Sequence, residues 1–245
     1  MSLELFFVFY VLLFVIAFLY ASVGHGGASG YLVLGSIFEL SKEVMRPAAL
    51  LLNLFVSFTA FIQFYRAKYF NKKIFFPLVI TSVPMAFWGG TISLHTDLYK
   101  LALGILLIIP VCRFLFFQNI TVDQIKKSNV FLSLLMGAAI GFVSGVIGIG
   151  GGIILSPLLL LLKWTDQKQT AAISALFIFV NSLAGLLGQF TKGIYFDKQM
   201  IGYILVAFLG GSAGAYFGAI KFNQAVLKIL LSLVLLIAAI KLIFT

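Results

Sequence analysis

The sequence is poor in charge. Only 10% of its 245 residues are Asp, Glu, Lys or Arg, while 62% are hydrophobic and the mean hydropathy is +1.15. A water-soluble domain needs more surface charge than this. The charged residues sit in or beside short gaps between continuous apolar runs, or at the chain ends. These runs are about 16–21 residues long, which suits membrane-spanning helices rather than barrel strands. The composition therefore predicts an all-α integral membrane protein.

Cysteine and the common enzyme motifs are also scarce. Cys112 is the single cysteine, so the chain can form neither an internal disulfide nor a thiolate cluster. The sequence has no CxxC, no HExxH and no Walker GxxxxGK[ST] loop for ATP. The glycine cluster at 148–152 superficially resembles a dinucleotide loop, but it lies between two apolar segments. We therefore expect no enzymatic activity, no cofactor and no metal site.

Acidic residues are missing from the interior of every apolar run. Cation transporters and proton pumps usually place a carboxylate there, so this absence favours an anion or a neutral solute. The formal net charge of +10 comes from basic residues spread over the loops that flank the apolar runs. That distribution is typical of membrane topology. It indicates contact with a lipid bilayer, and we expect no nucleic-acid partner.

The chain divides near its centre. Ten apolar segments follow one another, at 3–20, 22–38, 47–65, 74–94, 98–117, 129–147, 152–162, 170–190, 199–219 and 225–244. The one long polar connection predicts an N-terminal repeat at 1–117, a linker loop at 118–128 and a C-terminal repeat at 129–245. The first segment has no Lys or Arg before it, so we expect a retained span rather than a cleaved signal peptide.

The two halves share a glycine pattern. VGHGGASG at 23–30 aligns with IGIGGGII at 147–154 at a shift of 124. The glycines that coincide are Gly24 with Gly148, Gly26 with Gly150, and Gly27 with Gly151. Further along, the polar landmark at 69–72 matches the one at 195–198 at a shift of 126. Ordered landmarks of this kind indicate an internal duplication.

Each glycine cluster interrupts an apolar run. Lipid tolerates such a break only where protein or a water-filled cavity satisfies the freed backbone groups, and paired broken helices are typical of secondary transporters. Five segments per half is an odd number, so the second copy is expected to be inverted. The predicted fold is two inverted repeats, each with a glycine-broken hairpin plus three transmembrane helices, giving about 8–10 membrane segments.

The loop charges bear on this topology. One set of loops carries eleven basic residues and the other carries six. This bias places the first set in the cytoplasm and both termini outside. If one segment in each half fails to cross, the repeats are parallel instead.

A substrate site is predicted where the two breaks meet. Backbone N–H groups at a broken helix, together with the helix dipole, favour an anion. The alternative is a pair of tightly packed hairpins without a ligand. The candidate substrate-binding residues are Gly24, His25, Gly26, Gly27, Arg46, Asn53, Gly148, Gly150, Gly151, Gly152, Ser174 and Asn181.

Three of these side chains have specific alternatives. His25 stands where the second copy has Ile149, which indicates substrate binding or proton coupling unless it is a satisfied buried histidine. Arg46 precedes Pro47, the expected first residue of the third helix. Its guanidinium suits an oxyanion, or else pairs with Glu43 or a lipid phosphate. Asn53 lies two turns beyond Arg46, where it either joins helices or lines a pathway.

The strongest family resemblance lies in the second half. GVIGIGGGIILSPLLLLL at 145–162, followed by AAISALFIFVNSLAG at 171–185, resembles the TauE/SafE family of membrane proteins. That family is associated with export of sulfite and organosulfonates. The shared pattern is a glycine triplet, a downstream proline at Pro157 and an alanine-serine helix start. GHGGASG and RPAALLLN in the first half depart from the plainer pattern and resemble a subgroup with His and Arg at those places.

The resemblance implies a transporter without ATPase activity, and export as its direction. We therefore predict a secondary transporter of small sulfur-containing anions such as sulfite or organosulfonates, located in the plasma or inner membrane. Another small anion, a neutral solute and a non-transporting scaffold subunit are the alternatives. The particular substrate, the coupling ion and a homodimeric state are left open.

Overall fold

The computed structural model describes residues 3–92, 125–193, 198–223, 225–227 and 229–230. The helices within these ranges are α1 (Leu3–Ser22), α2 (Ala28–Ile37), α3 (Lys42–Arg66), α4 (Lys72–Gly90), α6 (Val130–Ile147), α7 (Gly152–Leu161), α8 (Gln167–Phe190), α9 (Gln199–Tyr216) and the short π-helix η1 (Phe217–Lys221). The apolar segments predicted at 98–117 and 225–244, and the linker predicted at 118–128, lie wholly or mostly outside the described residues.

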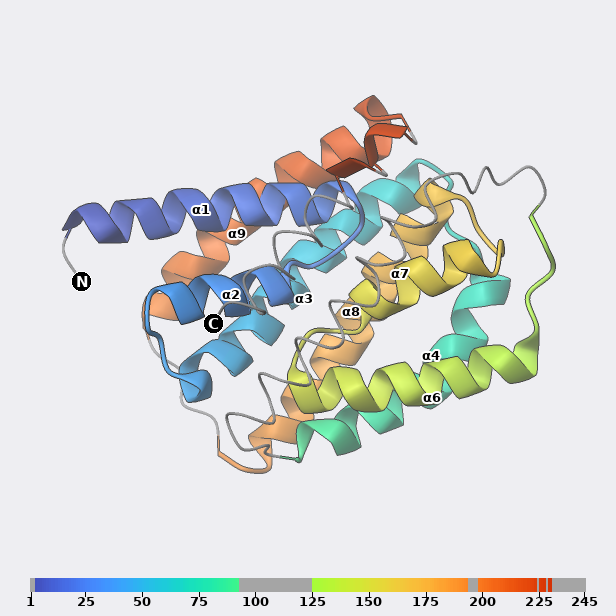
Figure 1. Cartoon of the computed structure of the whole chain (residues 1–245), viewed down its shortest axis with the longest axis horizontal. Coiled ribbons are helices and arrows are strands. Elements are labelled where there is room, and N and C mark those ends of the chain that lie inside the picture. Colours follow the sequence, from blue (N-terminus) through green and yellow to red (C-terminus); the bar gives the residue numbers. More distant parts are fainter. Residues whose placement is uncertain (1–2, 93–124, 194–197, 224, 228, 231–245) are drawn as a thin grey trace.

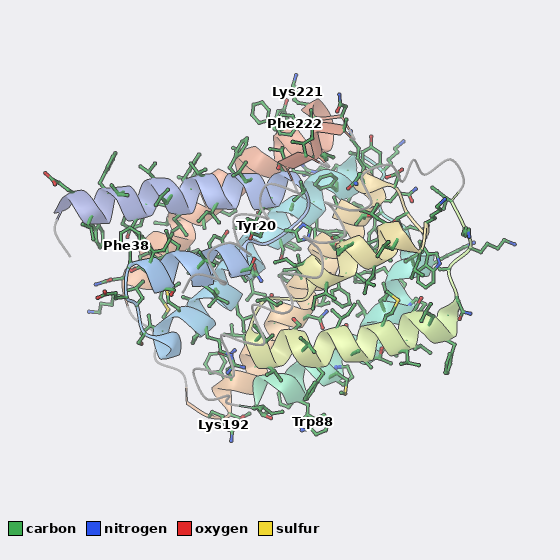
Figure 2. The ribbon with its side chains drawn as sticks, viewed as in Figure 1. Tyr20, Phe38, Trp88, Lys192, Lys221 and Phe222 are labelled. Atoms are coloured by element: carbon green, nitrogen blue, oxygen red, sulfur yellow. The ribbon has the colours of Figure 1, made fainter. Side chains whose placement is uncertain are left out.

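Six of the described helices are long and apolar enough to cross a membrane. They span Glu4–Ser22, Val44–Arg66, Lys72–Gly90, Val130–Ile147, Gln167–Phe190 and Gln199–Lys221. In the view of Figure 2, Trp88 and Lys192 lie at one end of the molecule, and Lys221 and Phe222 lie at the other. Aromatic and basic side chains at both ends are typical of membrane interfaces. The predicted all-α, multi-pass membrane protein is confirmed.

The helices α2 and α7 are too short to cross on their own. Each has ten residues, which corresponds to about 15 Å of helix, against a hydrocarbon core of about 30 Å. In Figure 1 each turns back along the helix before it, so that α1 with α2 and α6 with α7 form two hairpins. The glycine breaks form the turns of these hairpins.

The two halves pack in matching ways. α1 packs along α9 of the other half, as α6 packs along α4. α3 contacts α9 as α8 contacts α4, α2 contacts α3 as α7 contacts α8, and α3 and α8 pack on each other. If α1, α2, α3 and α4 are exchanged with α6, α7, α8 and α9, each of these contacts coincides with its counterpart, and the α3–α8 contact coincides with itself. In Figure 1 the colours show that the chain runs in opposite directions along α1 and α6, and along α3 and α8.

The duplicated glycines share backbone conformations. Gly24 and Gly148 follow α1 and α6 with φ of +78° and +84°, and Gly27 and Gly151 precede α2 and α7 with φ of +95° and +79°. A side chain disfavours this left-handed region, whereas glycine adopts it freely. The two ends of the turn are therefore built alike in both halves, and this requirement explains why these glycines recur. The middle pair differs, since Gly150 has a φ of +74° and Gly26 has no positive φ.

The start of α3 differs from the expectation. The helix begins at Lys42 and not at Pro47, which is its sixth residue. The Ser41 carbonyl accepts the N–H groups of Val44 and Met45 at 3.2 and 2.9 Å, which starts the helix before the proline. Pro47 lies so close to this end that it removes few backbone bonds.

We expect Gly24→Ala to lower the melting temperature of the purified protein more than Gly193→Ala does. Both glycines have positive φ, +78° and +80°, so each alanine adds about 1–2 kcal/mol of backbone strain. A Cβ at Gly24 would also overlap the Ala171 backbone of α8, whereas no atom of the described residues lies within 4 Å of a Cβ at Gly193. Thermal unfolding in detergent measures the difference. Equal shifts for both variants would contradict the close contact between the first break and α8.

Candidate functional site

Polar side chains from both halves gather around the two breaks and are closed to solvent. His25, Asn53, Ser156, Ser174 and Asn181 are each at most 1% exposed. Buried polar groups of this kind usually have hydrogen-bond partners. Their partners show which of the predicted residues the fold brings together.

The amide of Asn53 joins both breaks. Its Oδ1 accepts the backbone N–H of Ala28 at 3.0 Å, and its Nδ2 donates to the Ile149 carbonyl at 3.3 Å and to Ser182 Oγ at 3.2 Å. An N–H can only donate and a carbonyl can only accept, so these partners determine the orientation of the amide. A Cβ at either Gly26 or Gly150 would overlap this amide. Asn53 is therefore a positioning residue between the breaks.

The imidazole of His25 connects the first break to α7 and α8. Nδ1 lies 3.2 Å from the Val23 carbonyl and Nε2 lies 3.2 Å from Ser156 Oγ, which is 2.7 Å from Ser174 Oγ. Because a carbonyl only accepts, Nδ1 carries the hydrogen in its contact with Val23, and the Gly152 backbone is a further hydrogen-bond partner of the ring. A Cβ at Gly152 would lie 3.3 Å from His25 Cδ2. The predicted residues His25, Gly152 and Ser174 therefore lie together.

Arg46 lies beside the second break and is 7% exposed. Nη2 donates to the Gly145 carbonyl at 2.9 Å, and Nη1 donates to the Ile92 carbonyl at 3.2 Å. Gly145 belongs to the last turn of α6, where carbonyls lack helical partners and a cation is favourable. A Cβ at Gly148 would lie 2.9 Å from Arg46 Cγ. Arg46 thus stabilises the helix end that precedes the break. The side chain of Glu43, its predicted alternative partner, is not among those described.

Asn181 does not join the Asn53 network. Its Nδ2 donates to the Phe177 carbonyl of its own helix at 2.8 Å, and its Oδ1 has no hydrogen-bond partner within the described residues. The neighbouring Ser182, which was absent from the predicted set, is the α8 residue that contacts Asn53.

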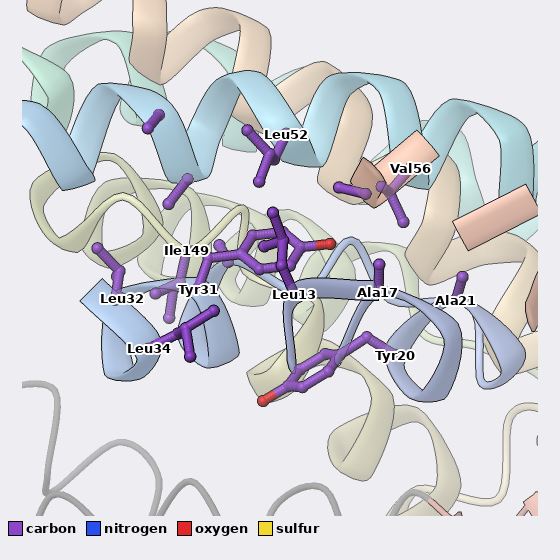
Figure 3. Packing of buried hydrophobic residues seen from close by; sticks show 14 of the residues in the cluster. Leu13, Ala17, Tyr20, Ala21, Tyr31, Leu32, Leu34, Leu52, Val56 and Ile149 are labelled. Carbon is purple, nitrogen blue, oxygen red and sulfur yellow. The ribbon is translucent and has the colours of Figure 1, made fainter. Parts of the chain in front are cut away.

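Sequence reasoning also missed two buried hydroxyl groups, on Tyr31 and Ser144. They are 0% and 1% exposed, and neither oxygen has a hydrogen-bond partner in the part of the chain that the structure describes. A Cβ at Gly27 would lie 2.6 Å from the Tyr31 hydroxyl, and a Cβ at Gly151 would lie 3.3 Å from Ser144 Cβ. In Figure 3 the Tyr31 ring lies between α1 and α3.

Each of these hydroxyl groups lies beside the glycine that precedes a short helix. Burying an unsatisfied hydroxyl costs about 1–3 kcal/mol, so both hydroxyls are donors suited to a ligand. Both lie within a few residues of a break. A search for polar residues flanking each glycine cluster would have found them.

The described acidic side chains lie away from this cluster. Glu4 and Glu39 are exposed, and Asp166 accepts the Gln169 N–H at 2.8 Å at the start of α8. The cluster presents hydroxyl, amide, imidazole and guanidinium groups together with the first N–H groups of α2 and α7. This donor set suits an anion better than a cation.

Comparison with known proteins agrees with a transport role. The family described as "Sulfite exporter TauE/SafE" matches residues 9–242. The "Probable membrane transporter protein y4hK" of Sinorhizobium fredii is 33% identical over 235 residues, covering 94% of this chain and 95% of that protein. The "Probable membrane transporter protein YdhB" of Bacillus subtilis is 24% identical over 230 residues, covering 90% and 91%. No solved structure matches significantly.

We expect Asn53→Ala to destabilise the purified protein by about 2–4 kcal/mol, because it leaves the Ala28 N–H and the Ile149 carbonyl buried without this partner. The control is Thr59→Ala on the same helix. Thr59 Oγ1 bonds only the Phe55 carbonyl of α3, at 2.7 Å, so this change should cost less than about 0.5 kcal/mol. Denaturant unfolding in mixed micelles compares the two. Similar losses of stability in both variants would contradict the bridging role of Asn53.

Proposed function

The chain belongs to the sulfite exporter TauE/SafE family, and we propose that it is a secondary transporter of small sulfur-containing anions such as sulfite or organosulfonates. It is a multi-pass membrane transporter by family and by its six long apolar helices. The family description supports export as the direction. A location in the plasma or inner membrane is part of the same proposal.

The observation that carries the proposal is the pairing of the starts of α2 and α7 around Asn53. Each short helix begins at a left-handed glycine, and beside each of these glycines lies a residue whose buried hydroxyl has no partner among the described residues. Helix starts attract anions through their free N–H groups and the helix dipole. Tyr31 and Ser144 add a donor at each start. A small oxyanion has acceptor oxygens on several sides, so it can bind both helix starts at once.

We also propose that the two repeats are inverted in the membrane. The opposite chain directions of α1 and α6, and of α3 and α8, support this orientation. The near-zero exposure of His25, Asn53 and Ser174 supports a state closed to both sides. In transporters with such repeats, movement of one half against the other opens a central site alternately to each side.

The rival functions make different demands on the site. A neutral-solute transporter would bind an uncharged analogue as well as the anion. A scaffold subunit would bind neither and would give no flux when reconstituted alone. An intramembrane enzyme would need a nucleophile or a general base aimed at a substrate, and the described cluster is arranged as hydrogen-bond donors around two helix starts.

We expect methanesulfonate to raise the melting temperature of the purified protein, since a ligand that binds the folded state stabilises it. Dimethyl sulfone has a similar shape without the charge and should give no shift. Equal stabilisation by the two compounds would favour a neutral solute. Absence of sulfite and sulfonate flux in proteoliposomes, together with no shift, would favour the scaffold.

Tyr31→Phe tests the site itself. The hydroxyl has no protein partner among the described residues, so its removal should leave the melting temperature without ligand unchanged or slightly higher. It should weaken methanesulfonate binding by about 2- to 10-fold, the effect of one lost hydrogen bond. Calorimetric titration measures the affinity. An unchanged dissociation constant would place the anion elsewhere.

A further inference from the structure

The two breaks differ in one titratable residue. His25 stands in the first, where the second has Ile149. His25 is 1% exposed, and its two ring nitrogens contact the Val23 carbonyl and Ser156 Oγ. Histidine is the side chain whose protonation ordinarily changes near neutral pH, so this difference places one switchable charge on one side of the proposed site.

The surroundings of His25 contain no acidic partner among the described residues. From α1, Tyr20 faces the imidazole with 6.5 Å between ring centroids, and its hydroxyl bonds Ser29 at 2.7 Å. From α7, the Ser156 hydroxyl and the Gly152 backbone are hydrogen-bond partners of the ring, and from α8 the Ser174 hydroxyl bonds Ser156. A protonated His25 would therefore be a buried charge with carbonyl and hydroxyl partners but no counter-charge among the described residues, which is unfavourable.

Three described charged side chains on α3 and at the start of α8 have partners other than His25. Arg46 on α3 donates to the Gly145 and Ile92 carbonyls. Lys168 on α8 donates to the Ala219 carbonyl at 3.2 Å and stacks over the Tyr69 ring. Asp166 binds the first turn of α8. These described side chains therefore supply no counter-charge to a protonated imidazole.

The hydroxyl chain beyond His25 can serve either protonation state. With a neutral ring, the Ser156 hydroxyl donates to Nε2 and accepts from Ser174. With a protonated ring, Nε2–H donates to Ser156 Oγ, and the Ser156 hydroxyl rotates to donate to Ser174 Oγ. The hydrogen of a hydroxyl group can rotate, so the group can donate in one direction and accept from the other. The His25–Ser156 and Ser156–Ser174 hydrogen bonds are therefore both kept when the ring is protonated. The reversal also releases the Ser174 hydrogen from the chain as an additional donor.

We infer that His25 binds a proton together with the transported anion, so that transport of the anion is coupled to protons; this rests on the proposed anion transport. The proton comes from water on the side where the anion enters, bonds to Nε2, and returns to water on the side where the anion leaves. The anion supplies the negative charge that the imidazolium lacks. Because linkage is reciprocal, a bound proton strengthens anion binding by the same factor. A monovalent anion then crosses with no net charge.

Calorimetric titration of the purified protein tests the inference. Methanesulfonate is titrated at a pH of about 7 in two buffers with different ionisation enthalpies, because this anion stays ionised and takes up no proton itself. The difference in heat gives the protons taken up from the buffer. We expect up to about one proton per anion for the wild type. Binding without proton uptake would overturn the inference and leave the proposed function standing, whereas no binding would count against the proposed function.

His25→Gln identifies the group. Its amide offers a donor and an acceptor but no site for a proton, so we expect methanesulfonate binding with no proton uptake. Thr59→Ala changes a residue of α3 that is remote from the cluster, so this variant should keep the wild-type proton uptake. Persistent uptake in His25→Gln would overturn the inference. If that variant does not fold, Ser156→Ala replaces it. Removing the hydroxyl that accepts from the imidazolium should lower the uptake, and an unchanged value would again overturn the inference.

Discussion

The side-chain amide of Asn53 is the contact on which the arrangement of both breaks depends. It accepts from the first residue of α2 and donates to a carbonyl of the second break, so the two starts of short helices are held around one side chain. Gly26 and Gly150 are small because the amide occupies the space where their Cβ atoms would lie. Without this bridge, the described residues of α3 would provide no direct polar link between the two breaks, which lie on separate hairpins. The proposed anion site, which both breaks share, would then lose its geometry.

The two halves are related in their backbone, but the side chains beside their breaks differ. Gly24 packs on the backbone of Ala171 at the start of α8, and Gly148 packs on Arg46 at the start of α3, so each break lies against the other half. Only the first break carries a histidine, and only the second adjoins a guanidinium that binds the preceding helix end. The N-terminal half thus supplies both the histidine of its own break and the arginine beside the other break, while both halves supply helix starts. The anion that we propose to bind between them would meet related backbone and unequal side chains.

Much of the fold could be predicted from the sequence, because glycine patterns and apolar lengths reflect local backbone requirements. The duplicated positive-φ glycines and the short second and seventh segments were recognisable for that reason. The start of α3 was not, since the Ser41 carbonyl begins the helix ahead of Pro47. His25, Gly152 and Ser174 were predicted as members of the candidate set, but their mutual contacts were not predicted. The Asn53–Ser182 bond depends on packing between distant segments, which no local pattern encodes. Tyr31 and Ser144 lie within a few residues of a break, but only the packing of the described residues shows that their hydroxyls lack a partner there.

The central claim is that one anion binds between the starts of α2 and α7. Anomalous diffraction from crystals soaked in selenate, a heavier analogue of a sulfur oxyanion, tests it most directly because selenium reports its own position. The account predicts an anomalous peak near the hydroxyls of Tyr31 and Ser144, beside Gly27 and Gly151, that is lost in the Tyr31→Phe, Ser144→Ala double variant. A peak confined to the basic ends of the helices, with none between the breaks, would contradict it.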